Sequence, residues 1–226
     1  MRKLKFSKED LRKISNSVKE AESTTSGEIK VAFIKESYDY AKYEVIFALF
    51  TGIIYLITIF LFQNQVETII RNMSWDYSPF YLTVFFGISP FVVMTIFYLV
   101  ANIPFVDRLI IPGRIQRKKV NERAVRYFIE SGVHTTRDRT GILIFLSFLE
   151  KRVELLADSG INARIPQEKW DGIVSHIIEG ISSGNTVENL TESVLECGKL
   201  LSESENFPIK PDDTNELKDD VSILEE

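Results

Sequence analysis

The side chains that could do chemistry in this sequence are carboxylates and guanidinium groups at the ends of apolar stretches. Asp158 ends the apolar run Val153–Ala157 and is followed by Ser159 and Gly160. A carboxylate at the end of a strand can bind a cation or act as a general base. An Asp-Ser-Gly sequence can also simply cap a turn. The sequence leaves both interpretations open for Asp158.

Two apolar runs around a polar break must position Asp158. Ile142–Leu146 and Val153–Ala157 flank Glu150–Arg152, a pattern typical of an antiparallel hairpin. Both runs are almost wholly apolar, so we expect helices on both faces of the sheet. Glu28–Ile34 also alternates as a strand does. The chain is therefore predicted to have an α/β fold.

The order of these elements predicts which residues meet. Glu28–Ile34 and Ile142–Leu146 are separated by a helix, which favours a parallel pair with a right-handed crossover. This connection places Glu28, the loop Arg137–Arg139 and Asp158 at one edge of the sheet, which we expect to lie away from the membrane. Carboxylates and guanidinium groups together could bind a divalent cation or a phosphate group. They are equally compatible with solvated loop charges that pair weakly.

Composition excludes several kinds of site. The chain has 226 residues, a net charge of -5, one cysteine and two histidines. Cys197 alone cannot form an intrachain disulfide or a cysteine-rich zinc site, and a metal would need mostly oxygen ligands. The sequence has no P-loop, no cysteine–arginine loop and no DxDx[TV] signature. Residues 203–226 hold nine acidic residues and two lysines, so the acidic balance comes from the tail.

Two long stretches contain no charged residue. Val45–Phe62 is uncharged over 18 residues and Pro79–Val106 over 28. Each is long enough to cross a bilayer. The alternative is a pair of buried helices in a soluble core, but two such runs so close together are rare outside membranes. We predict a transmembrane helical hairpin with spans at about 45–62 and 79–103, joined by a short polar link.

Basic residues predict the orientation of this hairpin. Ten lysines and arginines precede the first span, and the link between the spans has only Arg71. The positive-inside rule then places both termini and the α/β domain in the cytoplasm. A basic cluster also follows the second span, and its position favours lipid head groups over a nucleic acid. These basic residues are Arg108, Arg114, Arg117, Lys118, Lys119, Arg123 and Arg126.

Four stretches resemble the TPM domain family. They are AESTTSGEIKVAFI at 21–34, HTTRDRTGILIFLS at 134–147, EKRVELLADSGINARIPQEKW at 150–170 and NELKDD at 215–220. The resemblance implies a three-layer α/β/α sandwich around a small mixed sheet, here interrupted by the transmembrane hairpin. The family usually has proline where this chain has Lys218. We expect the acidic tail, 207–226, to be largely loop or disorder.

The resemblance also implies a site and two activities. Phosphatase activity and calcium binding are associated with the family, while other members act as partners or assembly factors. Carried over to this chain, Asp158 and Arg139 would be catalytic, and Ca²⁺ or another divalent cation would be held by oxygen ligands. Those metal ligands would be Glu28, Asp138, Asp158, Asn215 and Glu216.

We therefore expect a split α/β domain, with its first part at 1–43, the hairpin at 44–106 and its second part at 107–206. The leading hypothesis is a membrane-anchored binding or assembly module at the cytoplasmic face that binds a divalent cation and a membrane-protein partner. The alternative is a metal-dependent phosphatase acting on phosphate esters. A channel is a third hypothesis, but the two spans contain no charge that could line a path.

Overall fold

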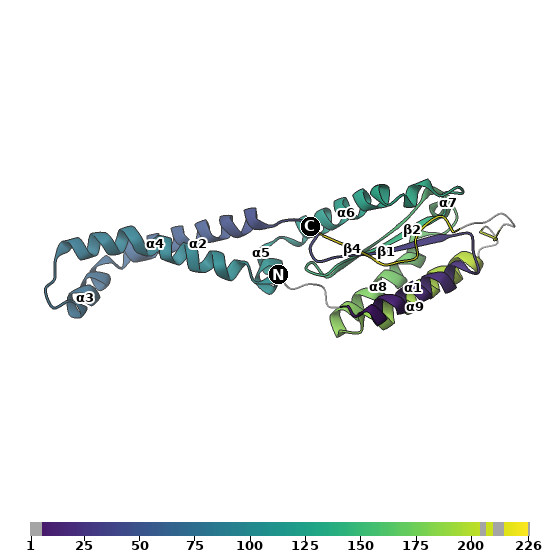
Figure 1. Ribbon diagram of the computed structural model, residues 1–226. Coiled ribbons are helices and arrows are strands. Elements are labelled where there is room, and N and C mark those ends of the chain that lie inside the picture. Colours follow the sequence, from purple (N-terminus) through teal and green to yellow (C-terminus); the bar gives the residue numbers. More distant parts are fainter. Residues whose placement is uncertain (1–5, 204–206, 210–214, 226) are drawn as a thin grey trace. The chain divides into compact units, whose positions relative to one another are not determined.

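The computed structural model describes residues 6–203, 207–209 and 215–225. The chain divides into two compact units (Figure 1). The first, called here the sheet unit, is formed by Met1–Tyr38 together with Arg114–Glu226. The second, called the helical unit, is Asp39–Gly113. The hairpin is thus inserted into the sheet unit.

The sheet unit is built on four strands in the order β3-β2-β1-β4. The strands are β1 (Glu28–Ile34), β2 (Gly141–Ser147), β3 (Arg152–Ala157) and β4 (Ser222–Leu224). β2 pairs with β1 in parallel and with β3 antiparallel. The predicted hairpin and parallel pair are both present, and the α/β fold class is confirmed.

Helices cover both faces of this sheet, giving three layers. One face packs on α1 (Lys8–Glu22), α8 (Gln167–Ser183) and α9 (Thr186–Glu203). The other packs on α6 (Gly113–Glu130). Alternate residues of β1 supply the two cores, so that Phe33 faces the three-helix layer and Ile34 faces α6. This alternation is the period-2 pattern of a strand buried on both sides.

Local signals fix where the helices begin and end. Ser7 and Asp10 form a reciprocal capping box at the start of α1. Gly184, with φ of 87°, ends α8 in the left-handed conformation that glycine adopts without strain. Two short helices border the sheet edge discussed below: η1 (Val133–Thr135) and α7 (Ser159–Asn162).

Most of the described acidic tail is loop, as the sequence predicted, but it includes one short strand. Residues 210–214 and 226 lie outside the described part of the chain, as do 204–206 in the segment before it. Residues 222–224, however, form β4, which pairs in parallel with β1 from Ala32 to Ile34. Only three residues pair, and Ser222–Leu224 follows a charged segment, which explains why no strand pattern was visible.

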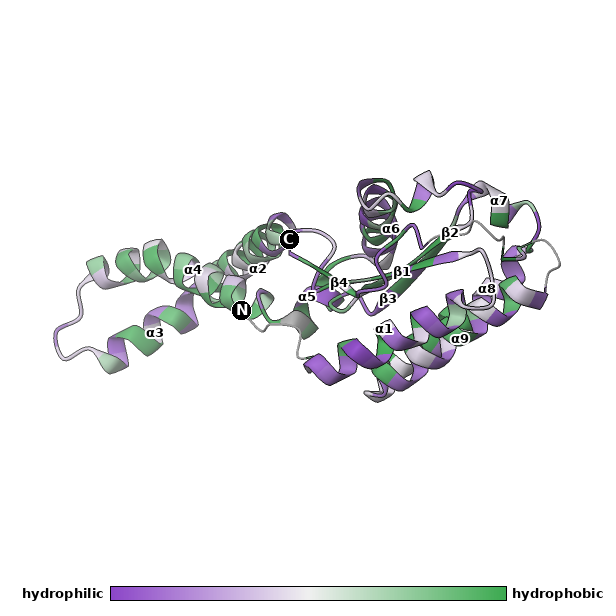
Figure 2. Ribbon diagram, turned by 45° about the vertical axis from the view of Figure 1, so that its right-hand side comes forward, coloured by the Kyte–Doolittle hydropathy of each residue, from purple (hydrophilic) through white to green (hydrophobic). Residues whose placement is uncertain are grey.

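The helical unit contains α2 (Ala41–Leu61), α3 (Gln63–Met73), α4 (Pro79–Ala101) and α5 (Pro104–Ile110). α2 and α4 are long and apolar enough to cross a membrane, and both are largely green in Figure 2. They pack on each other through ring pairs such as Phe47–Phe97, whose centroids are 6.1 Å apart. The predicted polar link is itself mostly helical, because α3 occupies it.

Candidate functional site

Glu28 and Asp158 lie at the same edge of the sheet, as the order of elements predicted. Glu28 is in register with Gly141, the first residue of β2. The backbone N–H of Asp158 donates to the carbonyl of Gly141 at 2.9 Å. Glu28 N–H donates to the carbonyl of Thr140 at 3.1 Å, which fixes the loop before β2 against β1. The start of two strands and the end of a third therefore meet here.

Asp158 caps α7, as the simpler sequence interpretation proposed. Its Oδ1 accepts hydrogen bonds from Ser159 N at 2.6 Å and from Ser159 Oγ at 3.2 Å. Its other oxygen, Oδ2, is buried, accepts no hydrogen bond from the described residues and lies 3.8 Å from Arg139 Nη1. One oxygen thus has a structural role and the other faces a guanidinium group.

The loop that carries Arg139 is held in a constrained conformation. Arg139 has a φ of +58°, which is unusual for a residue with a side chain. Its guanidinium donates to the carbonyl of His134 at 2.8 Å. Gly160 allows this loop to approach, because a Cβ there would lie 2.6 Å from the Arg139 carbonyl oxygen. Sparsely populated backbone conformations of this kind cluster at functional sites.

The carboxylate of Glu28 holds the C-terminal segment. Oε1 accepts the backbone N–H of Glu216 and Oε2 accepts that of Leu217, both at 3.1 Å. The Glu216 side chain in turn accepts the N–H of Arg137 at 2.9 Å, linking the segment to the Arg139 loop. Hydrogen bonds to a carboxylate are stronger than those between neutral groups. Glu28 is thus a binding group for the protein's own main chain.

Lys30, two residues further along β1, holds the same segment by its carbonyl groups. Its Nζ donates to Lys218 O at 2.7 Å and to Asp220 O at 2.9 Å. Burial lowers the pKa of Lys30, while the nearby carboxylates of Asp220 and Asp219 oppose the shift. Glu28 and Lys30 together bind the donors and acceptors of one backbone segment. We call this pair and the segment 215–220 the tail clamp.

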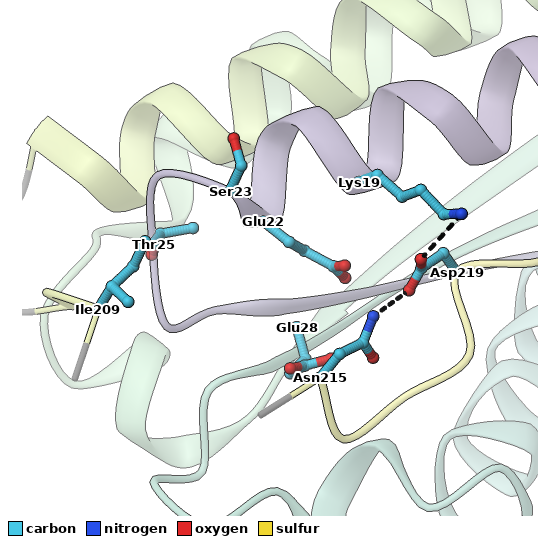
Figure 3. A pocket seen from close by; sticks show the side chains of 8 residues that line it. All are labelled: Lys19, Glu22, Ser23, Thr25, Glu28, Ile209, Asn215 and Asp219. Atoms are coloured by element: carbon cyan, nitrogen blue, oxygen red, sulfur yellow. Dashed lines mark hydrogen bonds and ion pairs between the residues drawn. The ribbon is translucent and has the colours of Figure 1, made fainter. Parts of the chain in front are cut away.

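An acidic pocket of about 290 Å³ opens beside the tail clamp (Figure 3). Glu22, Glu28 and Asp219 contribute carboxylates to it. Asp219 accepts a hydrogen bond from Asn215 at 2.5 Å and lies 3.8 Å from Lys19 Nζ. Burial, together with the charges of Glu28 and Asp219, raises the pKa of Glu22 to about 8. Glu22 therefore keeps its proton at neutral pH.

Four further residues of this site were not predicted from the sequence: Lys19, Glu22, Lys30 and Asp219. One signal was available for Lys30, because it lies inside an apolar strand predicted to be covered on both faces. A charge at such a position needs a partner. Glu22 and Asp219 gave no comparable signal, since each lies in a charged stretch whose placement depends on the fold.

Four of the five metal ligands implied by the family resemblance have partners within the protein. Glu28 accepts two backbone N–H groups, Asp158 caps α7, Glu216 accepts Arg137 N and Asn215 donates to Asp219. The side chain of Asp138 is exposed. Within the described ranges no three His, Cys, Asp or Glu residues are arranged to hold a metal ion. Cation binding by these residues stays a prediction.

An α/β sandwich with a mixed sheet and an apolar helical insertion defines the class of this protein. Residues 105–199 match the family model of the TPM domain, the family that the four stretches resemble. The match covers α5 to α9; β1 and the tail segment lie outside it. A comparison with curated proteins found no match.

A solved structure supports the fold. The NMR structure of BA42 protein from the psychrophilic bacterium Bizionia argentinensis superposes on this chain with a TM-score of 0.57. The alignment covers 99% of each chain, with 18% identical residues. At this identity the likeness concerns the fold alone.

Proposed function

We propose that this protein is a membrane-anchored binding or assembly module whose TPM domain is presented at the cytoplasmic face of a bilayer. Its partner would be another membrane protein. The proposal combines an anchor, argued from the exposed apolar surface of α2 and α4, with a site whose charged groups bind a polypeptide main chain.

The exposed apolar surface of α2 and α4 supports a membrane anchor. Only 22% of the most apolar window of α2 and 11% of that of α4 is buried. Soluble proteins rarely expose contiguous apolar surface of this extent, whereas a bilayer covers it. The orientation rests on lysine and arginine, since ten precede α2 and only Arg71 lies between α2 and α4.

The observation that carries a binding role is the tail clamp. Both oxygens of Glu28 are occupied by backbone N–H groups and Lys30 binds two backbone carbonyls. Such contacts recognise main chain rather than a phosphate ester. The Ser159 hydroxyl donates to Asp158 at 3.2 Å, but to Oδ1, the oxygen that already caps α7 by accepting the Ser159 N–H. The geometry therefore favours polypeptide binding over hydrolysis.

A metal-dependent phosphatase is the second candidate, and one observation favours it. Asp158 Oδ2 is buried beside the Arg139 guanidinium without accepting a hydrogen bond from the described residues. A guanidinium group can hold a phosphate and a carboxylate can orient water. This candidate would use Asp158 and Arg139.

One preparation distinguishes the two candidates. The full-length protein is extracted from its native membranes in mild detergent, separated by native electrophoresis, and assayed with p-nitrophenyl phosphate in the presence of Mg²⁺, Mn²⁺ or Ca²⁺. We expect a discrete complex of defined stoichiometry and larger than the 26.0 kDa chain, and no turnover above that of the buffer. Turnover that is lost in Asp158→Asn, from a protein that migrates alone, would replace the proposal by the phosphatase.

Calcium binding is tested separately. Because the predicted ligands are engaged elsewhere, we expect no saturable heat of Ca²⁺ binding by calorimetry. Saturable binding that is abolished by Asp219→Asn but not by Asp138→Asn would show that the acidic pocket is a cation site after all.

A further inference from the structure

α6 carries its excess positive charge at one end. Its first seven residues, 113–119, contain four basic residues and no acidic one. The remaining eleven contain two arginines and two glutamates and are therefore neutral overall. The charged end follows the helical unit directly in the chain.

Three of these basic residues are turned away from the sheet. Gln116, Val120 and Ala124 form the buried face of α6. Arg114 and Arg117 are exposed and form no ion pair with any residue that the structure describes. The side chain of a third, Lys118, is 74% exposed and pairs with Glu122 at 3.8 Å. We call Arg114, Arg117 and Lys118 the basic surface.

Lys119 differs from the basic surface, because the fold itself uses its charge. Its Nζ lies 4.3 Å from the centre of the Tyr38 ring and 3.0 Å from Glu122. Cation–π and ion-pair contacts of this kind stabilise a charge locally. Lys118 pairs with the same Glu122 at the longer distance of 3.8 Å, and Arg114 and Arg117 form no ion pair with the described residues.

The position of the basic surface is unfavourable for the helix alone. The N-terminal end of a helix is the positive end of its dipole, so positive side chains there are opposed rather than stabilised. Like charges three or four residues apart, such as Arg114 and Lys118, also repel each other. Local rules are broken in this way where a function requires it. An anion bound at this surface would remove both penalties.

The short connection between α4 and α6 indicates which anion could bind the basic surface. α4 ends at Ala101, and α5 takes up seven of the residues between it and Arg114. Even a fully extended connection would span only about 45 Å. If α4 crosses a bilayer, the basic surface is held within reach of its surface, where anionic lipids attract juxtamembrane lysine and arginine.

We propose that Arg114, Arg117 and Lys118 bind the head groups of anionic phospholipids in the bilayer that anchors the chain. This inference rests on the proposed anchoring. Head-group binding would fix the start of α6 at the membrane surface.

The test measures which lipid stays bound. Full-length protein is reconstituted into vesicles of equal amounts of phosphatidylcholine and phosphatidylglycerol, extracted into mild detergent and purified, and the retained lipids are counted by mass spectrometry. We expect phosphatidylglycerol to be enriched. The combined substitution Arg114→Gln, Arg117→Gln and Lys118→Gln should lower the enrichment about tenfold or more. Extraction at about 0.5 M NaCl should lower it in the unaltered protein.

A matched variant removes the same charge elsewhere. Lys8, Arg12 and Lys13 are exposed on α1, and their replacement by glutamine should leave the enrichment unchanged. Equal loss in both variants, or no loss in either, would overturn the proposal. So would tight binding of duplex DNA without lipid enrichment, which would identify the basic surface as a nucleic-acid site. Failure of the anchor itself is seen separately, as release from native membranes by alkaline carbonate.

Discussion

The sheet unit and the helical unit use the same apolar residues in opposite ways. In the sheet unit Phe33 and Phe145 have no exposed surface. In the helical unit Phe50 is 61% exposed and Phe91 is 68% exposed. Burial from water stabilises the first pair, whereas the second pair can be stabilised only by an apolar solvent or partner. The two units therefore keep their apolar side chains from water in different ways. The same substitution should have a different effect in each unit.

The largest difference is expected for phenylalanine truncation. Phe33→Ala removes a ring that contacts Phe6 and Phe148, with centroids 4.8 and 5.5 Å away, and should destabilise the sheet unit by about 3–5 kcal/mol. Phe50→Ala in α2 should leave the sheet unit unchanged. Urea unfolding of the full chain in detergent, followed by the fluorescence of the buried Trp170, measures both. Equal destabilisation by the two variants would mean that the units do not fold separately.

A charge on the outer face of α2 tests the solvent of the helical unit. Ile57 is 55% exposed, so Ile57→Asp would change stability by less than about 0.5 kcal/mol if this face met water. In a bilayer the same change should disfavour insertion by about 2.5–3.5 kcal/mol. We expect a marked loss of carbonate-resistant protein in membranes. Full retention of Ile57→Asp would show that α2 does not lie in lipid.

The parts of the fold that depend on local sequence patterns could be predicted, whereas those that depend on tertiary contacts could not. The pairing of β1, β2 and β3 was predictable, because Ile142–Leu146 and Val153–Ala157 are local apolar patterns joined by a short turn. The edge shared by Glu28 and Asp158 then follows from the direction of the strands. The capping role of Asp158 was one of the two interpretations that the sequence left open. The binding of the tail by Glu28 did not follow, because tertiary contacts determine the partners of this carboxylate.

The tail marks the limit of sequence reasoning. Composition favoured loop or disorder for an acidic segment, and Lys218 interrupts the pattern of the family. The segment is nonetheless bound, since two residues of β1 satisfy its backbone groups. Recognition of main chain leaves almost no trace in the sequence of the bound segment. The sequence signal lies instead in the binding strand, where Glu28 and Lys30 are charged residues in a buried, mostly apolar segment.

Replacing a glutamate in the sheet unit should affect the tail segment, whereas replacing one in the helical unit should not. Glu28→Gln leaves one backbone N–H of the tail segment facing an amide donor, which should cost about 1–3 kcal/mol. Hydrogen exchange at the amides of Glu216 and Leu217 should accelerate at least tenfold. Glu67→Gln, which removes an exposed pair with Arg71 in α3, should leave both amides unaffected. Unchanged protection in Glu28→Gln would show that the tail clamp does not depend on this carboxylate.

The pKa values of two glutamates, one in each unit, are shifted in opposite directions. Hydrogen bonds from Arg71 lower the pKa of Glu67, whereas burial raises that of Glu22 from its ordinary 4.5 to about 8. The folded sheet unit therefore keeps a proton on Glu22 that the unfolded chain releases above pH 4.5. Stability from this group is greatest at acidic pH and is lost as the pH rises from about 4.5 to 8.

Glu22→Gln should therefore flatten this part of the pH profile. Glutamine keeps an oxygen for the backbone N–H of Ile29, which Glu22 accepts at 2.8 Å, and it carries no charge to repel Asp219. Above pH 8 we expect the variant to be more stable by on the order of 1 kcal/mol, a value reduced for partial exposure to solvent. Melting temperatures of the full chain from pH 5 to 9 measure the effect, with Glu67→Gln as the control. A Glu22→Gln profile parallel to that of the unaltered protein would mean that Glu22 is already ionised at neutral pH, and that the acidic pocket carries one more charge than its geometry indicates.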